Sequence, residues 1–261
     1  MASRANGTKL QHDRQRAIYM EALRHGSVDV GDLARRHGVT TETIRRDLSD
    51  MQSRQLLRRV HGGAVPIERM NHEPLIEARD MVNAEEKLRI ASLAVDEVPE
   101  RGSVIIDSGS TGQRLAEVFP VEREVHVVTN SLLTALTLSR RGLRDLTVLG
   151  GTVRTKRHAM VDDTTRAELQ HMAIDVLFMS CDGLSFQHGL TTPYREERTI
   201  KRAMIERARR IVALVDSSKF GNGQMFSFAD FDEIDVLVTD TGADPDAVDA
   251  LGSHGISVRV A

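Results

Sequence analysis

The amino-acid sequence predicts an α/β protein in which a small, mainly helical head precedes an open, mostly parallel α/β sheet. Two observations support this prediction. Residues 1–65 have apolar residues at helical spacing and a basic charge balance, whereas the rest of the chain is acidic and alternates short apolar runs with helical stretches. We therefore divide the 261 residues into a head (1–65), a linker (66–88) that becomes helical near its end, and a body (89–261).

The overall composition excludes several classes of protein. With 40% hydrophobic and 28% charged residues, the chain has the composition of a soluble globular protein. No apolar run approaches the ~18 residues of a membrane span, and the polar start lacks a signal-peptide core, so we expect no membrane partner. Cys181 is the single cysteine, which rules out an internal disulfide and disfavours a cysteine-based zinc site. We expect a cytoplasmic protein without a metal or cofactor.

The net charge of −3 is divided unevenly along the chain. Residues 1–65 contain twelve Lys or Arg and seven Asp or Glu, a balance of +5, whereas residues 66–261 contain 23 and 31, a balance of −8. A basic head on an acidic body is expected when only one end of a protein meets a polyanion.

The head has the pattern of three short helices. Apolar residues share one face of the first helix (12–24), and a second helix covers residues 30–37. Gly38 supplies the tight turn between the second helix and the third, and Thr40 can cap the third. The buried face of the third helix recurs at helical spacing in Ile44, Leu48 and Met51.

A basic hairpin follows these helices, which makes the head a predicted winged helix-turn-helix. The start of the third helix would enter the major groove of DNA, where Arg can pair with guanine and Thr can meet phosphate or a thymine methyl. The strand at 56–60 and the turn after it would form a wing against the phosphate backbone. The alternative is a helical bundle that docks a protein. The predicted DNA contacts are Thr40, Thr41, Thr43, Arg45, Arg46, Arg58, Arg59, His61 and Gly62.

The body alternates strands and helices. Its apolar runs are nearly continuous, as in strands buried on both faces, and they lie at 104–106, 125–128, 146–149, 176–179, 211–215, 234–238 and 256–260. Small, hydroxylated, acidic and amide residues follow these runs. Because ligands bind at the carboxyl ends of strands in open α/β sheets, we expect a binding site there. Residues 107–111 form a strand–loop–helix junction that could hold a phosphate, and Lys219 could add a positive charge. Taken singly, each of these loops is more often only a capped turn.

Both parts resemble one protein family. Thr43-Ile44-Arg45-Arg46-Asp47-Leu48, followed by Arg59-Val60-His61-Gly62-Gly63-Ala64, closely resembles the DeoR family of bacterial transcriptional regulators. The body resembles the family's sensor domain at residues 107–111, at Gly189-Leu190-Thr191-Thr192 and at residues 216–221. That domain is related to ribose-phosphate isomerases and CoA transferases and senses phosphorylated sugars.

The resemblance implies an effector site and a mode of action. Ser108, Gly109, Ser110, Thr111 and Lys219 would hold the phosphate of a phosphorylated sugar, while Asp107, Asn130 and Asp182 would meet sugar hydroxyls. The remaining residues assigned to the site are Thr129, Gly150, Gly151, Arg154 and Gly183. The expected function is repression of a carbohydrate operon by a homo-oligomer, a dimer or larger, on double-stranded operator DNA, with release by the effector.

Two departures from the related sequences bear on this interpretation. Residues 161–164 place Asp162 and Asp163 where the family often has Gly-Pro, and carboxylates near a phosphate are unfavourable unless they point away. After Asp182-Gly183, the chain has Leu184-Ser185 where the related isomerases have a second Asp, which argues against proton-transfer chemistry. An isomerase-like enzyme with a DNA anchor and an interaction module without a ligand remain as alternatives, the enzyme on fold analogy alone.

Overall fold

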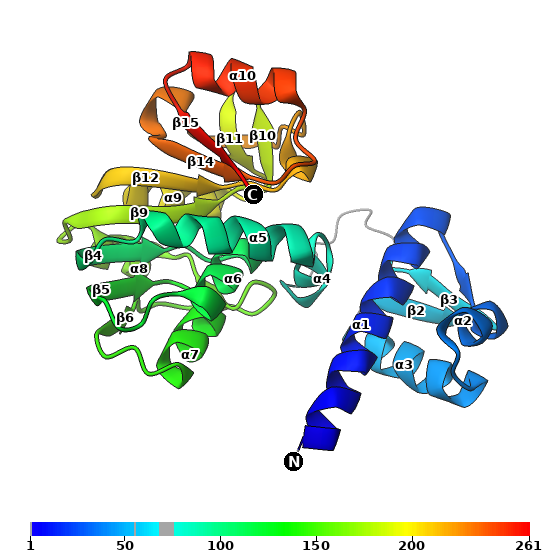
Figure 1. Cartoon of the computed structure of the whole chain (residues 1–261). Coiled ribbons are helices and arrows are strands. Elements are labelled where there is room, and N and C mark those ends of the chain that lie inside the picture. Colours follow the sequence, from blue (N-terminus) through cyan, green and yellow to red (C-terminus); the bar gives the residue numbers. More distant parts are fainter. Residues whose placement is uncertain (1, 55, 68–75) are drawn as a thin grey trace. The chain divides into compact units, whose positions relative to one another are not determined.

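The chain folds into two compact units, Met1–Val82 and Asn83–Ala261, which are described separately (Figure 1). The computed structural model describes residues 2–54, 56–67 and 76–261, and the side chains of all of these except residues 2–9 and 77. The division between the units falls within the segment predicted as a linker, of which residues 68–75 lie outside the described residues.

The first unit is the winged helix-turn-helix that the sequence predicts. Its strands form an antiparallel sheet in the order β1-β3-β2, in which β2 and β3 are the hairpin of the wing. The predicted second and third helices agree closely with α2 and α3, whereas α1 begins ten residues before the apolar pattern does. The elements are α1 (Ala2–His25), β1 (Val28–Asp29), α2 (Val30–His37), α3 (Thr41–Ser53), β2 (Leu57–Val60), β3 (Gly63–Pro66) and α4 (Ile76–Met81).

Local capping defines the ends of α2 and α3. The Asp29 carboxylate accepts hydrogen bonds from the first turn of α2, and Gly38 ends that helix in the left-handed conformation, with a φ of 62°. Thr40 caps α3 by accepting a hydrogen bond from the Thr43 amide at 3.1 Å. A left-handed residue and a hydroxyl cap, one after the other, turn the chain sharply between the two helices.

The core of the first unit includes residues from the predicted linker. Ile18, Leu33, Ile44 and Leu48 are fully buried in it, as expected from their helical spacing. Ala78 and Met81, on α4, belong to the same cluster. Residues 76–81 of the predicted linker therefore form a helix whose apolar side chains pack into the core of the first unit.

The second unit is built on a parallel sheet of seven strands in the order β15-β14-β12-β9-β4-β5-β6. The first strand of the unit, β4, lies inside the sheet between β9 and β5. Because all the strands are parallel, the polar loops at their carboxyl ends lie along one edge of the sheet. The strands are β4 (Arg101–Ile106), β5 (Glu124–Thr129), β6 (Leu146–Val148), β9 (Ile174–Ser180), β12 (Ala208–Leu214), β14 (Val236–Thr239) and β15 (Ser257–Val260).

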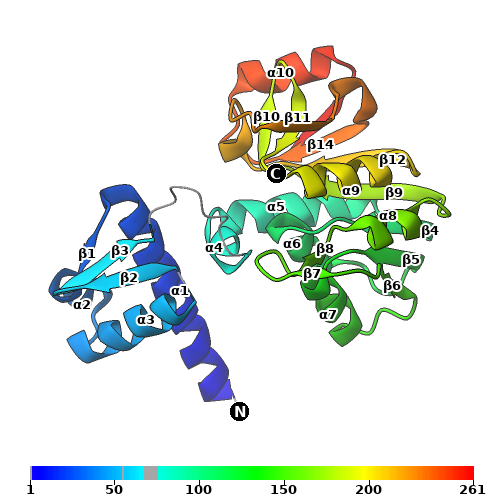
Figure 2. The same ribbon diagram turned by 180° about the vertical axis from the view of Figure 1, so that it is seen from behind.

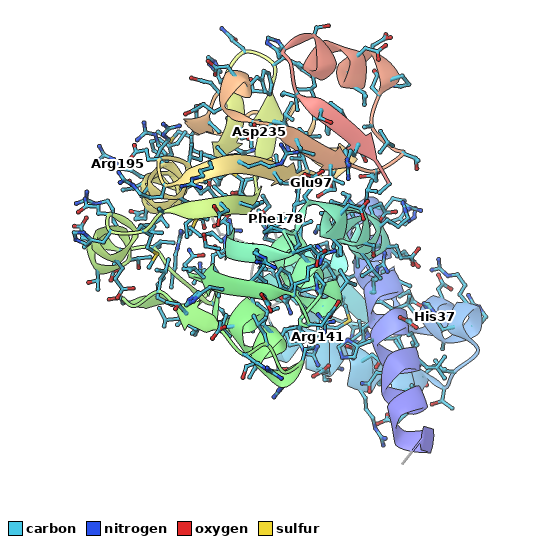
Figure 3. All side chains as sticks on the ribbon, turned by 60° about the vertical axis from the view of Figure 1, so that its left-hand side comes forward. His37, Glu97, Arg141, Phe178, Arg195 and Asp235 are labelled. Atoms are coloured by element: carbon cyan, nitrogen blue, oxygen red, sulfur yellow. The ribbon has the colours of Figure 1, made fainter. Side chains whose placement is uncertain are left out.

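Helices cover both faces of this sheet (Figure 2). One face packs against α5 (Ala84–Ala94), α6 (Ser110–Val118) and α7 (Leu132–Arg140), and the other contacts α8 (Asp163–Leu169), α9 (Arg195–Ile205) and α10 (Pro245–Ser253). Successive residues of β4 alternate between the two cores, since Val104 and Ile106 belong to one and Ile105 to the other. Burial on both faces explains the continuous apolar runs. Figure 3 shows Phe178 inside the sheet layer and Arg195 at the outer side of α9.

Two smaller sheets were not predicted from the sequence. One has the order β10-β11-β13, with β10 (Gly183–Ser185), β11 (Gly189–Thr192) and β13 (Phe226–Ala229); the other is the hairpin of β7 (Val153–Arg154) and β8 (Ala159–Met160). Short 3-10 helices occur at Val95–Glu97, Ser217–Lys219 and Phe231–Glu233. Among the described residues, no helix is long and apolar enough to cross a membrane.

Candidate functional site

The first turns of α3 present polar side chains to solvent. Thr40 and Thr41 are exposed, and the side chains of Arg45 and Arg46 are 56% and 79% exposed. Both arginines lie near the Glu42 carboxylate, at 4.0 Å and 3.5 Å, as exposed pairs within the helix. Such pairs contribute little free energy, so both guanidinium groups can exchange Glu42 for another partner. Thr43 is more restricted, because its hydroxyl lies 2.9 Å from that of Thr40.

The wing contains two kinds of predicted contact residue. Arg58, His61 and Gly62 are exposed, and Gly62 has a φ of 79° at the tip of the hairpin. Arg59 is attached to α3 instead: its amide donates to Gln52 Oε1 and its Nη1 donates to Ser49 Oγ, both at 2.9 Å. The wing strand is thus connected to the third helix, and its arginines differ in their freedom to reach a phosphate.

In the second unit, the loop before α6 requires a glycine and is held by neighbouring strands. Gly109 has a φ of 140°, and a Cβ there would lie 2.7 Å from Ser180 Oγ. The Ser108 amide donates to Asn130 Oδ1 at 3.0 Å, and Asn130 Nδ2 donates to the Met160 carbonyl at 3.0 Å. Asn130, which follows β5, therefore joins the loop before α6 to the strand that ends at Met160. These hydrogen bonds fix the geometry of the backbone at the start of α6.

Two hydroxyl-bearing residues occupy the first turn of α6. Ser110 and Thr111 are 3% and 4% exposed as whole residues. Among the described residues, neither hydroxyl is a buried atom that lacks a hydrogen-bond partner. A helix start with free amides and hydroxyls favours an anionic ligand.

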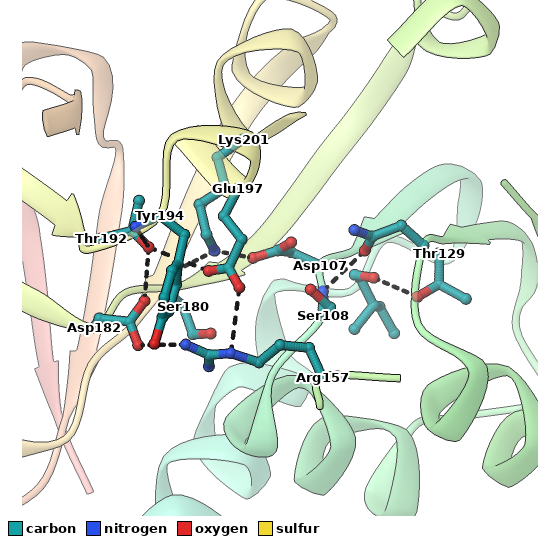
Figure 4. Close-up of polar contacts among 12 residues, drawn as sticks. Asp107, Ser108, Thr129, Arg157, Ser180, Asp182, Thr192, Tyr194, Glu197 and Lys201 are labelled. Atoms are coloured by element: carbon teal, nitrogen blue, oxygen red, sulfur yellow. Dashed lines mark hydrogen bonds and ion pairs between the residues drawn. The ribbon is translucent and has the colours of Figure 1, made fainter. Parts of the chain in front are cut away.

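Next to this loop lies a group of buried and partly buried charged and polar residues, drawn in Figure 4. We call it the strand-end cluster and define it as Asp107, Arg157, Asp182, Thr192, Glu197 and Lys201. The Lys201 ammonium, on α9, pairs with the Asp107 carboxylate at the end of β4, and it also donates to the Ser180 carbonyl at 2.7 Å. Both partners are almost fully buried, so each depends on the other for its charged state.

The other half of the strand-end cluster is arranged around Arg157. This guanidinium, 6% exposed, lies 3.2 Å from Asp182 Oδ1 and 3.3 Å from Glu197 Oε1. The Thr192 hydroxyl is within hydrogen-bond distance of both carboxylates, 2.9 Å from Asp182 and 3.1 Å from Glu197. Arg154 approaches Glu197 at 3.3 Å and lies over the ring of Tyr194.

Burial and pairing shift the pKa values in this group. Burial raises the pKa of Glu197, and the Arg157 charge opposes that shift. For Lys201, burial alone would lower the pKa, but the Asp107 and Glu197 carboxylates outweigh it, and the pKa lies above its ordinary value. Carboxylates and cations packed this closely suit a ligand that has both hydroxyls and negative charge.

The remaining predicted effector residues are mostly engaged in holding the backbone. Thr129 donates to the Ile106 carbonyl at 2.7 Å, and a Cβ at Gly183 would lie 1.6 Å from the Asn222 carbonyl oxygen. At Gly150, the amide donates to Glu168 Oε2 at 3.0 Å. A Cβ on Gly151 would lie 2.4 Å from Asp162 Oδ1. These positions support the loops, and their contact with an effector remains a prediction.

The side chains of Asp162 and Asp163 both interact with groups at or near the start of α8. Asp162 caps α8 and accepts hydrogen bonds from the Thr152 and Thr165 amides, which lower its pKa to about 2. The Asp163 side chain is 93% exposed and faces Arg166 within its own helix. Neither aspartate belongs to the strand-end cluster.

Lys219 lies in the short 3-10 helix at the carboxyl end of β12, on the same edge of the sheet. It follows β12, where Lys219 and the buried Lys87 outweigh the effect of burial and lower the pKa of Asp216. Asp216 also accepts a hydrogen bond from Asn83 at 2.9 Å. Nearby Cys181 is buried, and burial, with the Asp182 charge, raises the pKa of its thiol to about 12.

Sequence reasoning missed Arg157, Glu197 and Lys201. A signal was present for the last two, because helical spacing places them beside the buried Ile200 and Met204 on the apolar side of α9. Arg157 lies in the loop between β7 and β8 and had no comparable signal. Within the described residues, no group of three or more His, Cys, Asp or Glu side chains is placed to hold a metal ion.

Comparison with known proteins assigns both units to one family. The family model described as "DeoR C terminal sensor domain" matches residues 82–241, and that described as "DeoR-like helix-turn-helix domain" matches residues 14–70. Among solved structures, a ribose 5-phosphate isomerase A of Methanocaldococcus jannaschii is 19% identical over 53% of this chain and 55% of its own, with a TM-score of 0.40.

Curated relatives extend over almost the whole chain. The transcriptional regulator GlpR of Haloferax volcanii is 33% identical over 95% of this chain and 97% of its own length. A putative aga operon transcriptional repressor of Escherichia coli O157:H7 is 30% identical, covering 98% and 94%. The glycerol-3-phosphate regulon repressor of Escherichia coli K12 is 28% identical, covering 96% and 99%.

Proposed function

The chain belongs to the DeoR family of transcriptional regulators, and on this basis we propose that it represses a carbohydrate operon and is released by a phosphorylated sugar. The head binds double-stranded operator DNA through the start of α3 and the wing. The second unit binds the effector at the carboxyl ends of its strands. The protein acts in the cytoplasm as a homodimer or larger oligomer without a cofactor, because helix-turn-helix proteins usually bind paired half-sites.

The observation that best supports DNA binding is the orientation of α3. Its apolar residues Ile44 and Leu48 are fully buried, and that burial turns Arg45 and Arg46 to solvent near the helix start. In this motif the same part of the second helix enters the major groove. The exposed Arg58 beside it supplies a phosphate contact.

The observation that best supports a phosphorylated effector is the first turn of α6. Its free amides and the hydroxyls of Ser110 and Thr111 can receive a phosphate, while Asp182 and Glu197 offer acceptors for sugar hydroxyls. Lys219 adds positive charge at the same edge of the sheet. The acidic balance of the second unit gives no attraction for an anion, so these local groups must provide it.

The test is a release screen on DNA. The protein first selects a duplex from the DNA upstream of the genes that neighbour its own. The complex of the protein with that duplex is then treated with each member of a panel of hexose, pentose and ketose phosphates and glycerol 3-phosphate. Fluorescence anisotropy of the duplex measures its release. We expect one member of the panel to release the DNA. Turnover of ribose 5-phosphate by the same preparation would instead support the isomerase-like alternative, and release by none of the compounds would contradict a phosphorylated effector.

Variants of the proposed phosphate site test whether release of the DNA depends on that site. Ser110→Ala and Lys219→Ala should bind the duplex like the parent protein and require at least tenfold more effector, the size of one lost charge-assisted hydrogen bond at about 1.5–3 kcal/mol. The matched control is Ser92→Ala, whose exposed hydroxyl bonds to its own helix at the Leu88 carbonyl. Normal release in Ser110→Ala and Lys219→Ala would show that the phosphate binds elsewhere.

A further inference from the structure

Asp47 is a buried carboxylate on the helix that we propose enters the major groove. It is 1% exposed, although the two residues before it in sequence, Arg45 and Arg46, point to solvent. The other carboxylates of α3, on Glu42 and Asp50, are exposed or half-buried. Burying a carboxylate costs several kcal/mol unless it is paired and hydrogen-bonded, so Asp47 needs partners and its position must be specified by them.

Among the residues whose side chains the structure describes, all of its side-chain partners come from α1. Arg14 Nε donates to Asp47 Oδ2 at 2.6 Å, while Gln15 Nε2 and Gln11 Nε2 donate to Oδ1 at 3.2 Å and 3.3 Å. These donors occupy successive positions on one face of α1, and Arg14 is itself only 16% exposed. Both carboxylate oxygens are therefore satisfied by a single neighbouring helix, 32 to 36 residues away in sequence.

Apolar packing and hydrogen bonding constrain α3 differently. Ile44 and Leu48 determine which face of α3 is buried, but contacts between apolar side chains tolerate small rotations and translations of one helix against another. Hydrogen bonds weaken steeply with distance and angle, so three donors around one carboxylate define the position of α3 more closely. Paired hydrogen bonds from an arginine to a guanine edge need such definition.

We propose that Asp47 is a positioning residue for DNA recognition: the cluster of Asp47 with Gln11, Arg14 and Gln15 sets the rotation of α3 against α1 and thereby aims the base-contacting side chains. This inference rests on the proposed function, in which α3 contacts the bases. It assigns α1 a part in specificity that does not require α1 to contact a base. Asp47 itself does not touch DNA.

The experiment compares specific with non-specific binding by the full-length protein. The probes are a duplex enriched by the parent protein from a random-sequence pool and a scrambled duplex of equal length and composition, at one salt concentration. Asp47→Asn keeps the shape of the side chain and removes its charge. We expect affinity for the enriched duplex to fall about tenfold, the cost of one misplaced base contact, with less than a twofold change on the scrambled duplex.

A double-mutant cycle tests the connection with α1. Arg14→Gln should reduce discrimination about as much as Asp47→Asn, and combining the two should add little, because both remove the same interaction. The control is Asp50→Asn, on the same helix and also bonded to Gln15, at 3.0 Å, which should keep the full ratio between the two duplexes. Circular dichroism on every variant establishes that the protein measured is folded.

Two outcomes would overturn the proposal. A folded Asp47→Asn protein with a lowered melting temperature but an unchanged ratio between the duplexes would assign Asp47 to stability alone. An unchanged ratio in Arg14→Gln would contradict the link with α1. Failure of the proposed function is distinguishable, because it would appear in Arg45→Ala: if that variant keeps its discrimination, α3 does not contact the bases at all.

Discussion

The proposed binding surfaces of the head and of the second unit use their cations in opposite ways. In the head, Arg45 and Arg46 are exposed and only loosely paired, so they are available to a partner that covers the surface. In the second unit, Lys201 and Arg157 are buried and each is held by carboxylates. A large polyanion such as DNA is met by exposed cations, whereas a small ligand needs cations that the fold has already placed. The following predictions test this difference, from the largest expected effect to the smallest.

Removing one partner of the buried pair of Lys201 and Asp107 should destabilise the second unit far more than removing one partner of an exposed pair. Lys201→Met leaves the Asp107 carboxylate buried without its counter-charge, which we expect to lower the free energy of unfolding by about 3–5 kcal/mol. Urea unfolding followed by circular dichroism measures the change. The control is Arg209→Met, whose pair with Asp175 is 77% and 40% exposed and should contribute less than about 1 kcal/mol. Equal effects of the two variants would contradict the contrast between buried and exposed pairs.

Arg45 should matter for DNA binding and hardly at all for stability. Arg45→Ala is expected to lose about 1–3 kcal/mol of binding to the enriched duplex and to relax base preference at one position, because a paired contact to a base edge is lost. Competition binding with single-base variants of the duplex measures both effects. If affinity falls equally on every duplex, Arg45 contacts the phosphate backbone and not a base.

The wing should contribute to DNA affinity independently of the base sequence. Arg58→Ala is expected to weaken binding to the enriched and scrambled duplexes alike and to reduce the slope of log affinity against log salt by about 1, the value for one phosphate contact. Titrations at several salt concentrations give the slope. An unchanged slope would show that Arg58 lies away from the DNA, and Arg59, which is attached to α3, would then be the next residue to examine.

The smallest effect concerns the cap of α8. The pKa of Asp162 is lowered to about 2 in the folded protein, so its ionised form stabilises the fold above the ordinary pKa of 3.8, and this contribution is lost as the pH falls through about 2. Asp162→Asn should be less stable than the parent protein at pH 6, and the difference should narrow from pH 4 towards pH 2. Denaturant unfolding at each pH measures it; a difference that stays constant would assign the effect to the shape of the cap and not to its charge.

The same contrast explains how much the sequence could predict. The head is defined by local signals, and the third helix, its Thr40 cap and the wing were all recognised from spacing and turn residues within a few positions. The strands of the large sheet were also recognised, because burial on both faces leaves continuous apolar runs. Asp107 and Asp182 were found because polar residues at strand ends converge on one edge.

The rest of the candidate site depends on contacts between distant residues. Lys201 is separated from Asp107 by 94 positions, and a Glu and a Lys four residues apart on a helix ordinarily indicate an exposed pair. The short strands β7, β8 and β10 are too brief to give a pattern of their own. The contacts of Asp47 were missed for a related reason, since the carboxylate follows two arginines in sequence and its partners are on another helix.

The lone thiol of Cys181 offers a practical consequence. It is buried, with a pKa near 12, so it is almost entirely protonated at neutral pH and should react with alkylating reagents only when its surroundings open. The head contains no cysteine. The rate at which Cys181 is alkylated therefore measures how often the second unit opens, without any contribution from the head. A compound that slows this alkylation would be identified as a ligand of the second unit, in an assay that contains no DNA.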